Sequence, residues 1–478
     1  MNRGLRVLTS LLFVAVLGAL LGVLALNLVP AFNPAAPTPA ATAPAPSLPA
    51  ATVTALPPVG AGAPLPDAAT LKKTLDKALG HDGGGRFSAA VTDMATGSPL
   101  YDRKASVPSV PASSLKIATA AAVLAELGAD TTLPTSVVRG EGNSVVLVGG
   151  GDVLLGAGPS GEGVVGHAGL KTLAGLTADA VLAEARTGVG PAGGTLEVML
   201  DDSLFTGAAI NPVWDESLMT TSNITAVGPI ALYGARQNAK PNSPRVADPA
   251  LTAASTFRNL LAAALAEGAA GADGAAPGVA KAVVRAAAPE DARELATVES
   301  APLRDQLRHM GLESDNYVAE AMGRLVAIEV GKPATFGGAV QAVQEALARL
   351  GVDTTGMSLS DTSGLSAANR VSPGQLAGTL RAAAASTEPD LRDLNYLLPI
   401  AGATGTLTGR LEGDATRGLV RAKTGSLSGV ATLTGTVVTR DGRLLAFSFF
   451  AHDVPGSLAP ARAVLDRAAS ALAGCGCR

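Results

Sequence analysis

Ser113 and Lys116 stand three residues apart at the start of a long apolar segment, a spacing that puts both side chains on one face of a helix. A serine hydroxyl becomes a nucleophile when a neighbouring base takes its proton, and a lysine with a depressed pKa can be that base. Lys116 is the only one of the chain's ten lysines with serine at this spacing. Ser-x-x-Lys also occurs on solvated helix surfaces, so the pair predicts acyl transfer only if other motifs support it.

A second motif, Ser314-Asp315-Asn316, precedes an apolar helical pattern and contains the only Ser-x-Asn of the chain. Ser or Asp at this position could simply cap the helix. A capping turn would also fix the neighbouring side chains so that they point into a cleft. The motif is therefore compatible with a structural role and with a catalytic one.

The third motif is Lys423-Thr424-Gly425, just before a strand expected at 429–439. Its structural alternative is a solvated strand end with a turn glycine. In a functional site, Gly425 would let the strand edge approach a bound substrate backbone. Lys423 and Thr424 would then present a fixed cation and a hydroxyl.

The order Ser-x-x-Lys, Ser-x-Asn, Lys-Thr-Gly resembles that of penicillin-binding proteins and serine β-lactamases. More closely, the chain resembles the class C low-molecular-mass penicillin-binding proteins, the D-alanyl-D-alanine carboxypeptidase/endopeptidase family. The resemblance runs from about Asp67 to the end and includes Gly149–Asp152, Asp361–Ser366 and Gly405–Leu407. Two positions depart from the family pattern, since Thr362 replaces an expected Gly and Ser426 replaces a usual Thr.

The resemblance implies an α/β (α+β) fold, a β-lactamase/transpeptidase-like domain with an antiparallel sheet flanked by helices and a large inserted β-rich region. It implies an acyl-enzyme mechanism without a cofactor or a metal, in which a charged Lys423 favours the neutral form of Lys116. Backbone N–H groups of Ser113 and Ser426 would stabilise the oxyanion. The implied catalytic residues are Ser113, Lys116 and Ser314, and the implied substrate-binding residues are Asn316, Lys423, Thr424 and Ser426.

Composition excludes other function classes. Charged residues make up 16% of the chain and the net charge is −4, which does not suit a general nucleic-acid binder. The four histidines lie far apart, and no Cys/His cluster suggests zinc. The two cysteines, Cys475 and Cys477, could be free, joined in a small disulfide, or used between chains.

The N-terminal part predicts export. Residues 1–32 form a membrane anchor or signal segment, with Arg3 and Arg6 before an uncharged apolar stretch, and the positive-inside tendency leaves the rest outside the cytoplasm. Residues 33–66 are a Pro/Ala-rich linker that reads as an extended tether. We therefore expect an extracytoplasmic protein of the bacterial envelope, either membrane-anchored or secreted.

The body is expected to divide into a first transpeptidase-like part at 67–133, inserted domain(s) at 134–296 and a second transpeptidase-like part at 297–478. Periodicity predicts one sheet assembled from both ends of the chain. The expected helices are 67–80, 114–127, 248–266 and 457–473, and the expected strands are 87–94, 100–103, 144–148, 195–200, 429–439 and 443–451.

The expected function is a serine-type D-alanyl-D-alanine carboxypeptidase/endopeptidase that acts on peptidoglycan peptides and is acylated by β-lactams. Two alternatives remain open: a serine β-lactamase, and a non-catalytic wall-binding protein on the same fold. The long insertion and the absence of a recognisable Glu-x-x-Leu-Asn motif between Ser113 and Lys423 argue against the β-lactamase. The sequence does not separate carboxypeptidase from endopeptidase activity.

Overall fold

The computed structural model describes residues 62–80, 84–187, 194–269 and 277–476, which belong to one compact unit. The expected anchor at 1–32 and nearly all of the expected linker at 33–66 lie outside the described residues, as does Cys477. Within the described part of the chain, no helix has the length and hydrophobicity that a membrane span requires.

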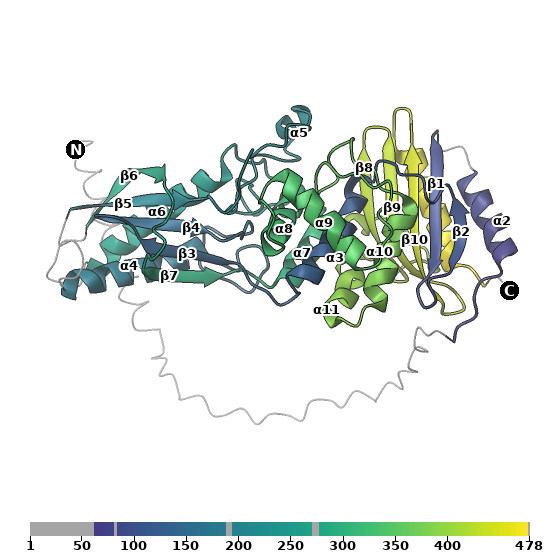
Figure 1. Ribbon diagram of the computed structural model, residues 1–478, viewed down its shortest axis with the longest axis horizontal. Coiled ribbons are helices and arrows are strands. Elements are labelled where there is room, and N and C mark those ends of the chain that lie inside the picture. The colour runs from purple at the N-terminus through teal and green to yellow at the C-terminus, as the bar shows by residue number, and fades with distance from the viewer. Residues whose placement is uncertain (1–61, 81–83, 188–193, 270–276, 477–478) are drawn as a thin grey trace, which may run out of the picture. The chain divides into compact units, whose positions relative to one another are not determined.

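One five-stranded sheet combines strands from both ends of the chain, as predicted from the sequence (Figure 1). All its neighbouring strands pair antiparallel. The order is β2 (Pro99–Arg103), β1 (Arg86–Asp93), β10 (Leu444–His452), β9 (Val430–Val438) and β8 (Val420–Leu427). This sheet with its flanking helices confirms the expected fold class.

Helices cover both faces of this sheet. On one face, α2 (Ala68–Leu79) and α12 (Ala459–Ala473) pack over Phe447 and Phe449 in one hydrophobic cluster. Phe450, the next residue, belongs to the cluster on the opposite face, because side chains alternate along a strand. The opposite face is covered by α10 (Pro373–Ala385). A sheet buried on both faces explains why β10 is a nearly continuous apolar run, whereas β9 alternates apolar residues with the buried Thr432, Thr434 and Thr436.

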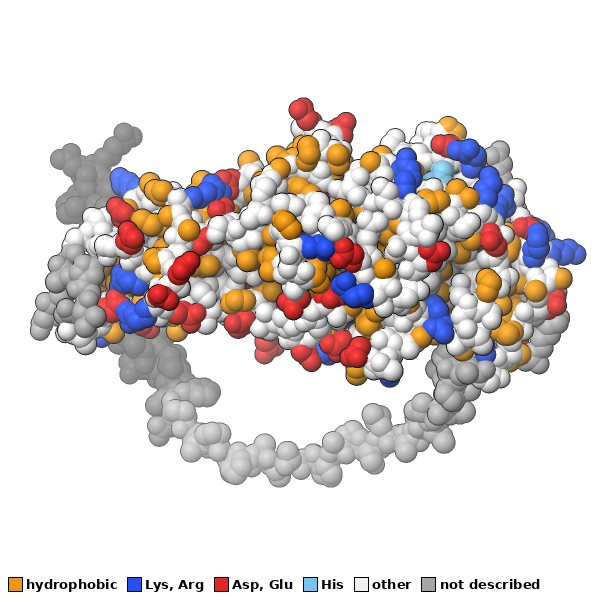
Figure 2. Space-filling model, in the orientation of Figure 1, with side chains coloured by type: hydrophobic (Ala, Val, Ile, Leu, Met, Phe, Trp, Pro, Cys, Tyr) orange, Lys and Arg blue, Asp and Glu red, His pale blue; other side chains and the backbone are white. Residues whose placement is uncertain are grey.

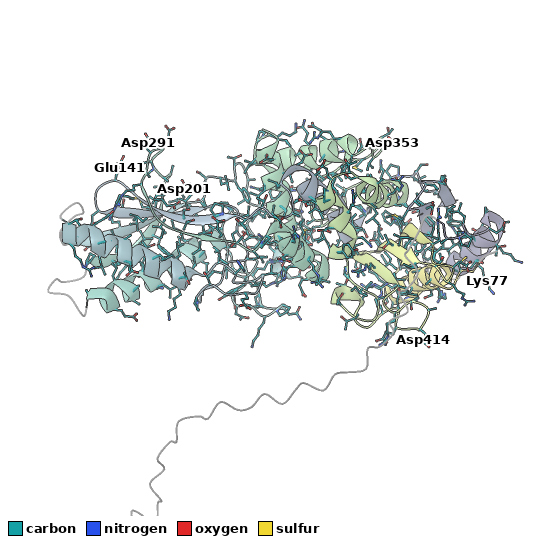
Figure 3. All side chains as sticks on the ribbon, turned by 90° about the horizontal axis from the view of Figure 1, so that it is seen from below. Lys77, Glu141, Asp201, Asp291, Asp353 and Asp414 are labelled. Carbon is teal, nitrogen blue, oxygen red and sulfur yellow. The ribbon has the colours of Figure 1, made fainter. Side chains whose placement is uncertain are left out.

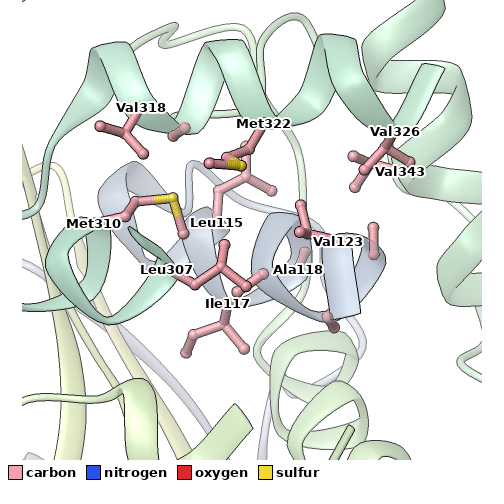
Figure 4. Close-up of a cluster of buried hydrophobic side chains, with 14 of the residues drawn as sticks. Leu115, Ile117, Ala118, Val123, Leu307, Met310, Val318, Met322, Val326 and Val343 are labelled. Carbon is pink, nitrogen blue, oxygen red and sulfur yellow. The ribbon is translucent and has the colours of Figure 1, made fainter. Parts of the chain in front are cut away.

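A helical layer beside the sheet holds the first motif. The turn η1 (Ala112–Leu115) leads into α3 (Lys116–Glu126), so the α-helix begins two residues later than the expected Ser114. Helix α3 is buried among α7 (Leu303–Glu313), α8 (Asn316–Glu329) and α9 (Phe336–Arg349). Figure 4 shows their apolar side chains in contact, among them Leu115, Ile117, Leu307, Met310, Met322 and Val343. This packing fixes the axis of α3 and therefore the place of Lys116.

The inserted segment forms a second five-stranded sheet of mixed direction. Two long helices, α4 (Leu170–Thr187) and α6 (Pro249–Ala269), share one hydrophobic cluster with it. Helix α4 was not among the helices expected from the sequence, so this region is more helical than expected. The strand order is β6 (Gly278–Arg285), β5 (Thr195–Asp201), β4 (Ser144–Gly149), β3 (Pro134–Arg139) and β7 (Glu294–Glu299).

Most charged side chains of the described residues are at least partly exposed at the surface. On the face shown in Figure 2, Lys and Arg side chains are interspersed with Asp and Glu. Figure 3 labels five exposed examples, Lys77, Glu141, Asp291, Asp353 and Asp414, which point away from their elements. The buried lysines and carboxylates described next are therefore exceptions, and burying a charge needs a compensating environment.

Candidate active site

Ser113 lies in the tight turn η1 and is partly exposed. The preceding Ala112 has a φ of 46°, a left-handed conformation that is uncommon for alanine. Hydroxyl groups beneath the turn hold it against the sheet. Ser114 Oγ lies 2.8 Å from Thr432 Oγ1, which also donates to Pro111 O at 2.9 Å.

Two glycines, Gly425 and Gly364, let neighbouring backbone approach this turn closely. A Cβ on Gly425 would lie 2.1 Å from Thr432 Oγ1 and 3.0 Å from Pro111 O, so Gly425 packs under the turn that carries Ser113. A side chain at position 425 would therefore clash with the interior of the turn. The sequence had suggested only that Gly425 gives a substrate room. Gly364 has a φ of 84°, and a Cβ there would lie 1.9 Å from Ala112 O.

Lys116 is fully buried directly behind Ser113. Its Nζ donates to Ser113 Oγ at 3.1 Å, to Asn316 Oδ1 at 2.7 Å and to Ser363 O at 2.6 Å. Burial lowers the pKa of Lys116 to about 8, although the nearby Asp361 and Glu320 favour the charged form. A lysine with this pKa is partly neutral near pH 7, as a general base must be.

Ser314, Asp315 and Asn316 form the junction between α7 and α8. Ser314 ends α7 in a left-handed conformation with a φ of 55°. Asp315 caps α8 by accepting from Tyr317 N and Val318 N, so the capping role suggested by the sequence is real. Asn316 accepts from Lys116 and donates from Nδ2 to Asn223 O at 3.0 Å.

Asp315 is clamped by two arginines that the sequence analysis missed. Arg245 Nη2 donates to Asp315 Oδ1 at 3.2 Å, and Arg236 Nη2 lies 3.6 Å from Oδ2. Burial would raise the pKa of Asp315, but Arg245 and Arg236 outweigh it and hold that pKa at about 2. Both arginines and Asn223 come from the inserted segment, so that segment contributes directly to the site.

Lys423 lies within strand β8, so the solvated strand end considered as its structural alternative is wrong. Its Nζ donates to Ser314 Oγ at 2.9 Å and to Thr424 O at 3.0 Å. Burial, and after it the charge of Lys116, lower the pKa of Lys423 well below its usual range. Since no carboxylate forms an ion pair with Lys423 among the described residues, its charged form lacks a counter-ion.

Thr424 and Ser426 alternate along β8 toward the same open cleft. Thr424 Oγ1 donates to Thr406 Oγ1 at 2.9 Å, and Ser426 Oγ accepts from Arg462 Nη2 at 2.9 Å. Neither contact was anticipated. Because Ser426 accepts from Arg462, its own hydroxyl proton remains available to another acceptor.

The three motifs meet at one cleft of about 510 Å³. Side chains of Ser113, Ser314, Asn316, Thr424 and Ser426 line it, and Lys116 and Lys423 lie behind the lining. The structure thus brings together all seven residues singled out from the sequence. Among the described residues, no group of three or more His, Cys, Asp or Glu could hold a metal ion.

Comparison with known proteins agrees with this arrangement. The model of the D-Ala-D-Ala carboxypeptidase 3 (S13) family matches residues 71–233 and 229–470. Carboxypeptidase Rv3627c of Mycobacterium tuberculosis is 38% identical over 428 residues, which cover 88% of this chain and 87% of that protein. The D-alanyl-D-alanine carboxypeptidase of Actinomadura sp. (strain R39) is 30% identical over 488 residues, which cover 86% of this chain and 87% of that protein.

Among solved structures, penicillin binding protein 4 (dacB) from Haemophilus influenzae matches with a TM-score of 0.63. It is 22% identical, and the match covers 83% of this chain and 97% of that one, so the two share a fold. The family match and the sequence relatives span most of the chain, including all three motifs. The chain belongs to the D-Ala-D-Ala carboxypeptidase 3 (S13) family.

Proposed function

We propose that Ser113 is the nucleophile and Lys116 the general base of a serine D-alanyl-D-alanine carboxypeptidase that cleaves peptidoglycan stem peptides. The family membership supports the serine peptidase activity. The observation that carries the residue roles is the 3.1 Å contact between Lys116 Nζ and Ser113 Oγ at the floor of the cleft. A nucleophile in hydrogen-bond contact with a base of lowered pKa is the arrangement that acyl transfer requires.

In the first step, neutral Lys116 takes the Ser113 proton while Ser113 Oγ forms a bond to the D-Ala-D-Ala carbonyl carbon. Backbone N–H groups of Ser113 and Ser426 stabilise the oxyanion, each contributing about 3 kcal/mol. The C–N bond then breaks, and the proton returns through Ser314 to the leaving amine. Water hydrolyses the acyl-enzyme, which restores the Ser113 hydroxyl.

The same cleft has groups for the rest of the substrate. Asn316 holds the substrate amide, and the hydroxyls of Thr424 and Ser426 bind its terminal carboxylate. That carboxylate supplies the negative charge that Lys423 lacks in the empty cleft, so substrate binding favours protonation of Lys423. This refines the sequence expectation of a permanently charged Lys423.

β-Lactams are expected to acylate the same serine because they mimic the substrate. Penicillin binding protein 4 from Haemophilus influenzae has been crystallised in complex with a β-lactam, which supports this proposal at the level of the shared fold. The alternative of a β-lactamase predicts fast turnover of nitrocefin with no action on D-Ala-D-Ala peptides. The proposed enzyme deacylates slowly and releases D-alanine.

The reaction is tested with purified pentapeptide and cross-linked muropeptides, whose products are identified by mass spectrometry. Release of terminal D-alanine by the wild type, and none by Ser113→Ala, supports the carboxypeptidase. Cleavage of cross-linked dimers would add endopeptidase activity. If neither substrate is cut, the enzymatic proposal fails and the wall-binding alternative gains support.

The family of cell-wall enzymes implies an extracytoplasmic role. We further propose that residues 1–32 anchor the chain in the membrane or direct its secretion, and that 33–66 tether the body. The uncharged apolar stretch after Arg3 and Arg6 supports this. We keep the division of the body at 67–133, 134–296 and 297–478 as a proposal. Fractionation of cells that express the full chain separates the anchored form from the secreted form.

A further inference from the structure

Glu320 is a buried carboxylate that the proposed mechanism does not use. It lies on α8, one turn after Asn316, and is 0% exposed. Its Oε1 accepts from Thr362 N at 3.2 Å and from Ser363 N at 2.8 Å. Its Oε2 accepts from Thr362 Oγ1 at 3.0 Å. All these donors belong to the turn that passes behind Lys116.

That turn contacts both residues of the first motif. Ser363 O accepts from Lys116 Nζ at 2.6 Å, and Gly364 packs against the backbone of Ala112 and Ser113. Asp361 braces the other side of the turn, where it accepts from Gly364 N at 2.8 Å. Glu320 therefore holds the carbonyl that orients Lys116.

We propose that Glu320 is a positioning residue for the general base: its carboxylate holds the turn whose Ser363 carbonyl orients Lys116, and its charge sets the proton affinity of that lysine. This inference rests on the proposed roles of Ser113 and Lys116. It assigns a function to a residue outside the three motifs.

Thr362 suits Glu320 in either protonation state. An ionised Glu320 accepts from Thr362 Oγ1, which also lies 3.0 Å from Ala319 O. A protonated Glu320 can donate to the same hydroxyl, which then donates to Ala319 O. The Thr362 that departs from the expected family Gly thus keeps the carboxyl hydrogen-bonded when its charge changes.

Other charged residues also act on Glu320 and Lys116. Burial and the neighbouring Asp361 raise the pKa of Glu320 to about 7. Asp361 and Asp315 raise the pKa of Lys116, and Arg245 lowers it. Arg324, on α8, interacts electrostatically with Glu320. Lys423, on β8, interacts in the same way with Lys116. The pKa of Glu320 is about 7 and that of Lys116 about 8, whereas the pKa of Asp315 is held at about 2, so Glu320 and Lys116 both change charge near neutral pH.

The substitution Glu320→Gln removes the negative charge of the side chain and keeps its shape and hydrogen bonds. The amide oxygen can still accept from Thr362 N and Ser363 N, and the amide nitrogen can donate to Thr362 Oγ1. We expect the variant to fold and its rate of acylation by labelled penicillin to keep a sigmoidal pH dependence. Without the negative charge, the midpoint moves to lower pH by about one unit.

Glu345→Gln, which removes an exposed carboxylate paired with Lys332 on the surface, is the matched charge control and should leave the midpoint in place. Thr362→Val removes the hydroxyl at nearly constant volume and should shift the midpoint less, in the same direction. Thr362→Ser should restore it. If Glu320→Gln does not fold, Thr362→Val and Thr362→Ser test the proposed effect of the Glu320 charge on Lys116.

An unchanged midpoint in Glu320→Gln, or a rate loss of the same size at every pH, would overturn the proposal and leave Glu320 a structural residue. Wild-type labelling is measured first in the same experiment. Its absence at every pH would instead contradict the proposed nucleophile and base, so the two failures are distinguishable.

Discussion

At the scale of single residues, the proposed reactivity of Ser113 rests on a lysine, Lys116, that folding has removed from water. Lys116 is 1% exposed, and its three hydrogen bonds go to a hydroxyl, an amide and a carbonyl rather than to a carboxylate. Burial without direct ion pairing disfavours the ammonium form. The same packing that forms the core around α3 therefore activates the base.

This environment predicts the pH dependence of acylation. Because burial lowers the pKa of Lys116 to about 8, the acylation rate should rise with pH and level off above that value. Below it, the neutral fraction falls about tenfold per pH unit. Stopped-flow acylation by a labelled penicillin between pH 5 and about pH 10 measures the profile. A rate that falls as the pH rises toward about 8 would contradict the role of neutral Lys116.

At the scale of elements, the nucleophile turn depends on the close approach of the Gly364 turn. Gly364→Ala would bring a Cβ to 1.9 Å from Ala112 O at a left-handed φ, so the turn that carries Ser113 must move. We expect a loss of acylation of at least about tenfold, since small displacements of reacting groups cost rate steeply. Gly378→Ala is the matched control, because nothing lies within 4 Å of its added Cβ. Equal acylation by both variants would rule out this dependence.

The junction of α7 and α8 depends on an ion pair with the inserted segment. Arg245→Met leaves the buried Asp315 with Arg236 as its remaining cation. Since Arg245 is the stronger of the two cations and its loss leaves the buried charge of Asp315 only partly compensated, we expect a loss of about 3 kcal/mol in the free energy of unfolding. Chemical denaturation measures it.

Arg285→Met is the control for that experiment, because its pairs with Asp202 and Asp248 are partly exposed, whereas Arg245 and Asp315 are each 3% exposed. Exposed pairs contribute about 1 kcal/mol or less. Similar losses in the two variants would show that burial of the Asp315 pair does not matter.

Local patterns predicted the elements that carry their own signals. Asp67 caps α2 as expected, and the alternating residues of β1 and the hairpin of β9 and β10 were recognisable. Six of the seven site residues were found because rare motifs contain them, and Ser426 was implied by the family resemblance. Glu320 and Arg245 were not predicted from the sequence, since a buried carboxylate or arginine has no local signature and its partners lie far away in the sequence. The burial of Lys423 was missed because β8 was not recognised as a strand.

At the scale of the whole molecule, residues from distant parts of the chain meet at the site, including Trp214 and Asn223 of the middle segment that carries the second sheet. Asn223 O accepts from the catalytic-motif residue Asn316, and Trp214 Nε1 donates to Asp361 Oδ2 at 2.9 Å. The inserted segment therefore braces the S-x-N junction and the Asp361 turn from the outside.

Among the described residues, those that line the cleft all lie between Ser113 and Ser428. A chain that begins at residue 62 should be acylated at the same rate as the full chain, while losing any association with membranes. Labelled penicillin and cell fractionation measure the two properties separately. A truncated body that folds but is not acylated would show that residues 1–61 have a role in the site.

The most direct test of the account is the mass of the intact protein after incubation with penicillin. We predict one added penicillin per chain, located by peptide mapping on Ser113, and no adduct in Ser113→Ala. Absence of an adduct in the folded wild type, or an adduct that persists in Ser113→Ala, would contradict the assignment of Ser113 as the nucleophile.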